Sequence, residues 1–364
     1  MTSRVLEPMS FRNGVHARNR VWLAPMTNQQ SHADGTLSDD ELRWLEMRAR
    51  GGFGVIETCA AHVALDGQGW PGELGVYDDR LMPGLTRLAT TLGSHGALSI
   101  AQIFHGGTRA PSSLTGKRPW TASEPAEAPP GADLPRAATE EDIAGAIASF
   151  GAAAARASKA GFAGVELHGA HGYLLCQFLS ATMNLRTDAW GGSLEGRARL
   201  VRETLRAVRG AVPARFLVGV RLSPEDFGNA RGLDLDESLT VARWLAEDGA
   251  DFIHVSLWDA KRNTRKRPDE HAVPLFRAAL PREVALVAAG NVWTVADAEA
   301  LLDRGADAVA LGRAAVANPA WPLDAAQAGW EPRRPPLTVA ELGERGLSAP
   351  FANYMRSWKG FVAD

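Results

Sequence analysis

Cysteine and lysine are scarce in this chain of 364 residues. The two cysteines, Cys59 and Cys176, cannot form a disulfide framework and cannot supply the four thiolates that an iron–sulfur cluster normally needs. Arginine makes up most of the 39 basic residues, which are scattered among 42 acidic residues and leave a net charge of -3. This balance gives no electrostatic reason to expect a nucleic acid or an anionic membrane as a partner.

Long apolar runs are also missing. No stretch reaches the roughly 18 residues of a membrane span. The first residues, MTSRVLEPMSF, lack the charged-then-apolar layout of a signal peptide. Hydrophobic residues make up 45% and charged residues 22%, proportions that exclude wholesale disorder. We therefore expect a soluble cytoplasmic protein whose length suits two average domains or one large barrel.

Eight short apolar segments rich in Val, Ile or Leu recur along the chain, as expected of strands that are buried on both faces. They lie at residues 21–24, 54–57, 98–102, 164–167, 216–220, 252–255, 284–287 and 308–311. Helical patterns fill the intervals, with Ser38, Thr139 and Thr294 as expected N-caps and Gly161 and Gly305 as expected ends. Eight βα units without a GxGxxG motif favour a single (β/α)8 TIM barrel over a doubly wound sheet.

Two long connections interrupt this rhythm, at residues 105–138 and 258–273, and both lie on the barrel face where active sites are built. Each either contributes to a site or is a solvated surface loop. The second connection is basic and contains Lys261, Arg262, Arg265, Lys266 and Arg267. We expect residues 1–330 to form the barrel. The unusually aromatic segment 331–364 is expected to pack on the barrel or on a neighbouring subunit.

The fourth apolar segment leads into His168, His171 and Tyr173. Two histidines could begin a metal site, but zinc needs three or four ligands and residues 168–173 contain no Cys and no third His. Two neutral imidazoles could instead donate to one substrate oxygen and stabilise the negative charge that develops there. Tyr173 would then be a proton donor to a carbanion or enolate. A third interpretation is one buried histidine beside unrelated surface groups.

Charged and glycine residues mark the ends of three later segments. Arg221 lies in the fifth, where its desolvation requires an anionic or carbonyl-rich partner, either a ligand or a structural ion pair. Gly290 and Asn291 follow the seventh segment, and Gly312 and Arg313 follow the eighth. Loops at these two places commonly hold phosphate in barrels. We therefore expect a phosphorylated cofactor or substrate.

Residues 168–197, HGAHGYLLCQFLSATMNLRTDAWGGSLEGR, resemble the signature of the old yellow enzyme family of flavin-dependent oxidoreductases. Further matches lie at residues 24–27, 101–107, 221, 290 and 312–313, so that the resemblance spans roughly residues 5 to 325. It implies a barrel that holds FMN without a covalent bond at the carboxyl ends of its strands. It also implies NAD(P)H as the reductant.

The resemblance implies roles for the matched residues. Gln102 and Arg221 would bond to the polar edge of the isoalloxazine ring, with Arg221 stabilising the negative charge of the reduced flavin, and Thr27 would tune the flavin potential. The residues expected to line the ring are Ala24, Pro25, Met26 and Ala60. Those expected to hold the phosphate are Gly290, Asn291, Gly312 and Arg313. His168 and His171 would bind the oxygen of an electron-withdrawing group, and Tyr173 would deliver the proton.

The activity implied is an ene-reductase that reduces activated C=C bonds of α,β-unsaturated carbonyl or nitro compounds in two ping-pong steps. The alternatives are a flavin-dependent dehydrogenase or demethylase of the same fold, and a metal-dependent barrel hydrolase that uses His168 and His171. The leading interpretation requires no metal. The natural substrate, the choice between NADH and NADPH and the oligomeric state, a homo-oligomer included, stay open.

The sequence also departs from the family pattern. Its sixth segment ends in VSLWD, residues 255–259, without the small Ser-Gly-Gly run common in relatives. The basic residues 261–267 follow, and they either contact the anionic part of NAD(P)H or are simply solvated. The absence of iron–sulfur cysteines and of a further nucleotide-binding domain argues against the larger relatives that reduce dienoyl-CoA or oxidise trimethylamine.

Overall fold

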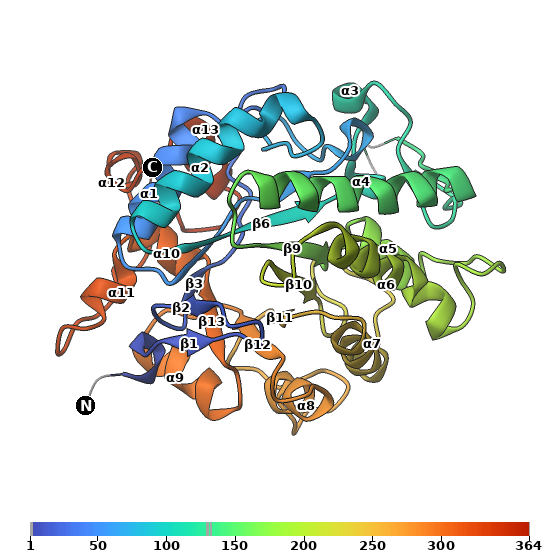
Figure 1. Ribbon diagram of the computed structural model, residues 1–364. Helices are drawn as coiled ribbons and strands as arrows, with labels where there is room; N and C mark the ends of the chain where they lie inside the picture. Colours follow the sequence, from blue (N-terminus) through green and yellow to red (C-terminus); the bar gives the residue numbers. More distant parts are fainter. Residues whose placement is uncertain (1–2, 129–130, 132, 364) are drawn as a thin grey trace.

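The computed structural model describes residues 3–128, 131 and 133–363, and these form a closed barrel of eight parallel strands (Figure 1). Residues 129, 130 and 132 of the first long connection lie outside the described residues. Each barrel strand pairs with the next, and the last pairs with the first. The barrel strands are β3 (Val21–Leu23), β4 (Val55–Glu57), β6 (Leu98–Phe104), β9 (Gly164–Gly169), β10 (Leu217–Leu222), β11 (Phe252–Ser256), β12 (Ala285–Ala289) and β13 (Ala308–Leu311). The predicted strands and the (β/α)8 TIM barrel are confirmed.

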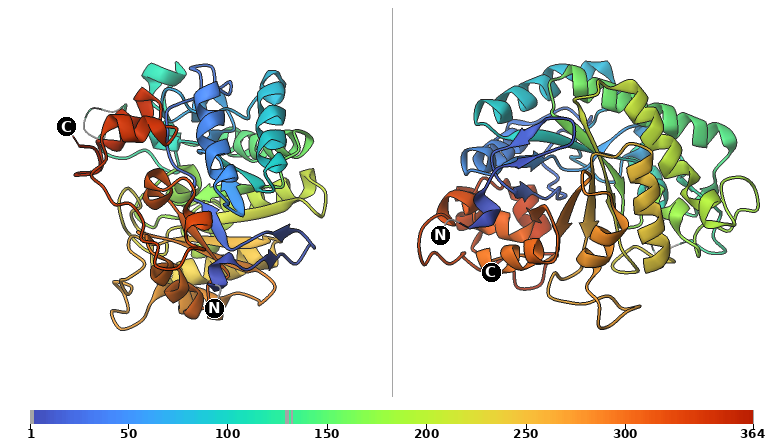
Figure 2. Two further views of the ribbon diagram at one scale, coloured as in Figure 1. Left: turned by 90° about the vertical axis from the view of Figure 1, so that its left-hand side faces the viewer. Right: turned by 60° about the horizontal axis from the view of Figure 1, so that its bottom comes forward.

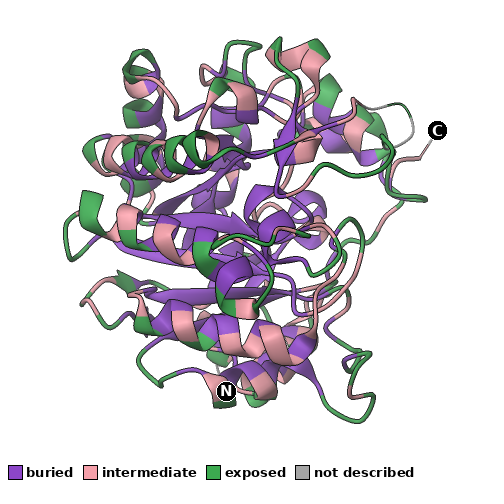
Figure 3. Cartoon of the chain, turned by 90° about the vertical axis from the view of Figure 1, so that its right-hand side faces the viewer, coloured by how far each residue is buried: buried purple, intermediate pink, exposed green. Residues whose placement is uncertain are grey.

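A helix follows each barrel strand and covers the outside of the sheet. These helices are α1 (Asp39–Arg50), α2 (Met82–Ser94), α4 (Glu140–Lys159), α6 (Leu194–Ala211), α7 (Leu235–Glu247), α8 (Ala272–Ala279), α9 (Val295–Asp303) and α10 (Arg313–Ala317). The three predicted N-caps are present: the Ser38 hydroxyl accepts from the Glu41 backbone, and Thr139 and Thr294 form capping boxes. Figure 3 shows the buried strands enclosed by helices whose outer faces are exposed.

The inside of the barrel is apolar at its amino-terminal end. Trp22 and Phe252 meet edge to face with ring centroids 5.1 Å apart, and Phe11 covers both. Phe11 follows β1 (Met9–Ser10), which forms an antiparallel hairpin with β2 (His16–Ala17) across this end. Gly219 leaves room for Phe252, because a Cβ there would lie 2.2 Å from the ring. Two residues further along the same strands, the inward side chains become polar and charged.

The remaining elements lie in the long connections and beyond the barrel. The first connection contains α3 (Ser112–Thr115), β7 (Trp120–Thr121) and β8 (Arg136–Ala137); the others are β5 (Ala61–His62), α5 (Leu174–Leu179), α11 (Trp321–Asp324), α12 (Val339–Glu344) and α13 (Ala349–Met355). The C-terminal helices pack against α1, where the Phe351 and Trp44 rings lie 4.8 Å apart (Figures 1 and 2). Among the described residues, no helix is both long and apolar enough to cross a membrane.

Candidate active site

The residues singled out from the sequence lie at the carboxyl ends of the barrel strands. Three of these residues lie within strands: Gln102 in β6, His168 in β9 and Arg221 in β10. His171 and Tyr173 lie between β9 and α5. The others directly follow strands: Ala24, Pro25, Met26 and Thr27 after β3, Ala60 after β4, Gly290 and Asn291 after β12, and Gly312 and Arg313 after β13. Because all eight strands are parallel, these ends meet at one mouth of the barrel. The structure therefore brings residues that are far apart in the sequence to one face.

His168 and His171 form a pair at this mouth, with ring centroids 5.0 Å apart. The backbone N–H of Ala170 donates to His168 Nδ1 at 3.3 Å, so that the neutral ring carries its proton on Nε2. His171 has a φ of 59°, a left-handed conformation that is uncommon for a residue with a side chain. Its backbone N–H donates to Ser223 Oγ at 3.2 Å, which helps to hold this conformation.

Both imidazoles are neutral. Burial lowers the pKa of His168 and of His171 well below the usual value, and the nearby positive charge of Arg221 lowers both further. A neutral imidazole offers one N–H donor and no net charge. The pair can therefore bind a carbonyl or nitro oxygen without supplying a proton to it.

Tyr173 is the third group of this cluster and lies 4.8 Å from the His168 ring, centroid to centroid. Burial raises the pKa of Tyr173 to about 12, although the Arg109 guanidinium, 4.3 Å above the ring centroid, partly opposes this. The phenol is therefore protonated at neutral pH. Phe104 and Trp70, which stack on one another at 5.2 Å, form an apolar wall beside it together with Ala60.

Ser256, at the end of β11, connects the histidine pair to Arg221. Its Oγ lies 2.7 Å from His171 Nε2 and accepts a hydrogen bond from Arg221 Nη2 at 3.1 Å. When the Ser256 hydroxyl donates to His171 Nε2, the proton of the neutral ring lies on Nδ1. Sequence reasoning missed Ser256, although it had noted that the sixth strand departs from the family pattern at this place.

The loops after β6 and β9 are held together by Gln177, which lies in α5. Its Nε2 donates to the backbone oxygens of Gly106 at 3.2 Å and Gly172 at 2.8 Å, and its Oε1 accepts from the Thr108 backbone at 3.2 Å. A Cβ on Gly107 would lie 2.2 Å from Gln177 Oε1, so only glycine fits there. This contact fixes the loop that contains His171 and Tyr173.

A layer of charged side chains lies just inside the barrel from the cluster of His168, His171 and Tyr173. Glu57, Glu166 and His254 are fully buried and place one ligand-type atom each within 4.8 Å of the others. His254 Nδ1 lies 2.8 Å from Glu166 and 3.6 Å from Glu57. Burial and the negative charge of Glu166 raise the pKa of Glu57 to about 7. Sequence reasoning missed these three residues, although a charged residue in an apolar strand is itself a signal.

Arg221 and Gln102 complete this layer on the side of the pocket. Within the described residues the Arg221 guanidinium forms no ion pair, which favours a ligand over the alternative of a structural ion pair, and its buried Nε has no hydrogen-bond partner. Burial lowers the pKa of Arg221. A buried, partly unpartnered guanidinium at the carboxyl end of the barrel suits a ligand with electronegative edge atoms, such as the flavin ring.

The loops after β12 and β13 offer a glycine backbone and a guanidinium, which suit a phosphate group. Gly290 has a φ of 155°, and a Cβ there would lie 2.7 Å from Leu257. Arg313 Nη2 donates to Asn291 Oδ1 at 2.9 Å, and the Trp358 ring lies 4.7 Å from the same guanidinium. The residues present thus fit FMN at both of its polar ends. Near the ring end, burial raises the pKa of Tyr354, and the neighbouring Thr27 side chain partly opposes this.

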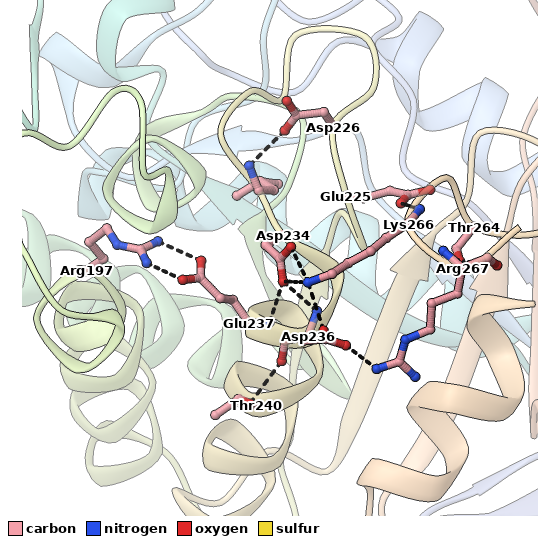
Figure 4. Close-up of polar contacts among 11 residues, drawn as sticks. Arg197, Glu225, Asp226, Asp234, Asp236, Glu237, Thr240, Thr264, Lys266 and Arg267 are labelled. Atoms are coloured by element: carbon pink, nitrogen blue, oxygen red, sulfur yellow. Dashed lines mark hydrogen bonds and ion pairs between the residues drawn. The ribbon is translucent and has the colours of Figure 1, made fainter. Parts of the chain in front are cut away.

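The basic connection after β11 is largely exposed, and acidic residues bind part of it (Figure 4). Lys266 Nζ lies 2.7 Å from Asp234 and 2.8 Å from Asp236, and Arg267 also pairs with Asp236. The Arg265 backbone donates to Glu225 at 2.7 Å. These contacts join the connection to the loop after β10 and to the start of α7, and they pair the charges of Lys266 and Arg267 with carboxylates.

Residues 4–329 match the NADH:flavin oxidoreductase / NADH oxidase family. The chain is 37% identical over 324 residues to the "Probable NADH-dependent flavin oxidoreductase YqiG" of Bacillus subtilis, a match that covers 87% of this chain and 86% of the relative. It is 34% identical to an NADPH dehydrogenase of Halalkalibacterium halodurans, over 95% of this chain and 96% of the relative. It is 35% identical to an NADH:fumarate oxidoreductase of Klebsiella pneumoniae, over 88% of this chain but only 36% of that longer relative.

Solved structures agree with these matches. An old yellow enzyme homologue from Zymomonas mobilis superposes with a TM-score of 0.80 at 26% identity and covers 93% of this chain and 96% of its own. Morphinone reductase in complex with tetrahydroNAD also has a TM-score of 0.80 and 26% identity, over 99% of this chain and 98% of the other. The chain therefore belongs to the NADH:flavin oxidoreductase family of old yellow enzymes, and it is an NAD(P)H-dependent oxidoreductase with FMN as its cofactor.

Proposed function

We propose that this enzyme reduces the activated C=C bond of α,β-unsaturated carbonyl or nitro compounds in two separate half-reactions. One observation carries the proposal: two neutral imidazoles and one protonated phenol lie in ring contact at the mouth of the barrel. The Klebsiella relative is named for the reduction of fumarate, which is an activated alkene, and this name supports the same class of substrate.

His168 and His171 bind the oxygen of the electron-withdrawing group. Nε2–H of His168 and Nδ1–H of His171 are the donors that their hydrogen bonds leave for the pocket. Negative charge develops on this oxygen when a hydride adds to the β-carbon, and donors placed in a dry site stabilise it. The link from His171 through Ser256 to Arg221 holds the second ring in place.

Tyr173 supplies the proton to the α-carbon. Its raised pKa keeps the phenol protonated until a strongly basic carbon centre forms beside it. The positive charge of Arg109 over the ring favours the phenolate that remains after the transfer. Solvent then returns one proton to Tyr173, so that each turnover uses one hydride and one proton.

Gln102, Arg221 and the loops of Gly290 and Arg313 would hold FMN, which when bound would supply the hydride-carrying chemistry between NAD(P)H and the alkene. Arg221 stabilises negative charge at the polar edge of the ring, and Gln102 orients that edge. Ala24, Pro25, Met26 and Ala60 line the ring, and Thr27 tunes its potential through one hydroxyl. Asn291 and Gly312 hold the phosphate with Gly290 and Arg313.

The proposal is tested by Tyr173→Phe, which keeps the ring and removes only the hydroxyl group. In stopped-flow measurements with 2-cyclohexenone or a maleimide, reoxidation of the reduced enzyme should slow roughly 100-fold or more. Reduction of the enzyme by NADH or NADPH should change little, because that step needs no phenol. Tyr77→Phe removes a hydroxyl that donates to the Asp34 backbone oxygen outside the pocket, and it is the matched control.

Equal slowing of both half-reactions by Tyr173→Phe would point to a structural role for this residue. Unchanged reoxidation by the enone would remove Tyr173 as the acid and would count against alkene reduction. Quinone reduction in the same variant should suffer less than enone reduction, because an oxyanion can take its proton from solvent.

A further inference from the structure

Gln102 and Glu166 lie side by side inside the barrel. They are direct Cα partners on the neighbouring parallel strands β6 and β9, and both side chains are buried. Gln102 Nε2 donates to Glu166 Oε1 at 2.7 Å. Gln102, which is assigned to the flavin ring, is thus hydrogen-bonded on its inner side to Glu166. The proposed function gives Glu166 no role.

This hydrogen bond determines which way the Gln102 amide faces. An ionised carboxylate only accepts hydrogen bonds, so the amide must turn its NH2 group to Glu166. The amide oxygen then points away from Glu166, and it accepts no hydrogen bond from any described residue. A protonated Glu166 would remove this constraint, because a carboxylic acid can also donate to the amide oxygen.

The surrounding charges keep Glu166 ionised in spite of its burial. Burial raises the pKa of Glu166, but the attraction and hydrogen bond of His254, the charge of Arg221 and the bond from Gln102 outweigh it, and the net pKa is lowered. His254 Nδ1 lies 2.8 Å from Glu166 Oε2. Glu57, the other acid of the layer, forms no hydrogen bond through either oxygen. The negative charge of the layer therefore lies on Glu166.

We propose that Glu166 is a positioning residue for FMN: it fixes the Gln102 amide so that an acceptor oxygen, and not only NH2, faces the cofactor. The polar edge of the isoalloxazine ring contains one N–H group, at N3, among several acceptor atoms. The Gln102 oxygen matches this N–H, while the Arg221 guanidinium matches the acceptors. The inference rests on the placement of FMN against Gln102 in the proposed function.

The test is the affinity of the apoprotein for FMN, measured by quenching of FMN fluorescence. Glu166→Gln gives residue 166 an NH2 group that can donate to the Gln102 oxygen and turn the Gln102 amide round. Its dissociation constant for FMN should rise on the order of tenfold or more, as expected for a misdirected hydrogen bond to a buried polar group. Glu57→Gln is the matched control: it is an equally buried acid of the same layer that makes no bond to Gln102, and it should change the constant less than threefold.

A double-mutant cycle separates positioning from a general loss of structure. Gln102→Leu should itself weaken FMN binding, and in that background Glu166→Gln should have little further effect. An equal effect of Glu166→Gln with and without Gln102, or no effect in either, would overturn the inference. No effect of Gln102→Leu alone would instead contradict the placement of FMN, and with it the inference. Alkene turnover does not enter these measurements, so a failure of the proposed function would be seen separately.

Glu166→Asp is the second variant, in case Glu166→Gln does not fold. It keeps the negative charge for His254 but shortens the side chain by one methylene, which withdraws the acceptor from Gln102. FMN binding that weakens while the melting temperature of the apoprotein is retained supports positioning. Wild-type FMN affinity in Glu166→Asp would show that only the charge matters and would overturn the inference.

Discussion

The two ends of the barrel interior are built by the same strands from opposite kinds of residue. On β11, Phe252 packs among aromatic rings at the amino-terminal end, and two residues later His254 pairs with Glu166. On β10, Leu217 lies in the apolar cluster, and Arg221 four residues later reaches the pocket. Because side chains alternate between the two faces of a strand, every second residue points into the barrel. Successive inward residues on one strand therefore belong to successive layers of the interior.

This difference separates what holds the barrel together from what equips it for chemistry. The apolar end buries large rings at close packing and contributes directly to folding. The charged end takes acids, an imidazole and a guanidinium out of water, and such groups commonly add little to stability. Two hydrogen bonds, from Gln102 to Glu166 and from Arg221 to Ser256, connect the charged layer with residues at the mouth of the barrel.

The largest expected effect comes from truncating the apolar end. Phe252→Ala should lower the free energy of unfolding of the apoprotein by about 3–5 kcal/mol, because it leaves a cavity between Trp22 and Phe11. Arg221→Met, on the neighbouring strand, should change the free energy of unfolding by only about 1 kcal/mol, because the buried charge that it removes adds little to stability. The same substitution should raise the dissociation constant for FMN on the order of tenfold or more. Urea unfolding and FMN titration measure both. A larger loss of FMN affinity in Phe252→Ala than in Arg221→Met would break the division.

A pH series sharpens the comparison within the charged layer. The pKa of Glu57 is raised from 4.5 to about 7 by burial and by Glu166, while His254 and Arg221 oppose this. A raised pKa means that the folded state binds the proton more tightly. The resulting stability is fully present below pH 4.5 and is lost as the pH rises through 7, at about 1.4 kcal/mol for each unit of pKa difference.

Glu57→Gln should therefore remove much of the loss of stability that accompanies a rise in pH. The pKa of His254 is also raised, with Glu166 as the main opposing charge to its burial, so part of the decline should remain in the variant. Denaturant unfolding of the apoprotein between pH 5 and 8 provides the measurement. Parallel curves for the wild type and Glu57→Gln would show that Glu57 does not titrate in this range.

The smallest expected effect concerns charges on the surface, where water competes. Lys266→Gln removes the exposed pair with Asp234 and Asp236 and should lower stability only slightly. High salt should reduce the difference from the wild type, because it screens exposed charges. The apparent Michaelis constant for NAD(P)H should stay nearly unchanged. A large salt-dependent rise in that constant would restore the basic connection as a contact for the dinucleotide.

Much of this protein could be predicted from its sequence because the signals involved are local. Hydrophobic periodicity identified the eight strands, and Ser38, Thr139 and Thr294 marked helix starts that the structure confirms. Once the strands are parallel and form a barrel, their carboxyl ends must meet. The placement of Gln102 and Arg221 at one mouth therefore followed from the order of the elements alone.

The tertiary structure alone decided which polar groups touch. Glu57, Glu166 and His254 come from β4, β9 and β11, and nothing local in the sequence indicates that barrel closure and strand register bring them within 4.8 Å. The same holds for the contact of Lys266 with Asp234, which joins two separate connections. Capping and periodicity are properties of a few consecutive residues. The ionisation of a buried acid depends on every charge around it, and those neighbours exist only in the closed barrel.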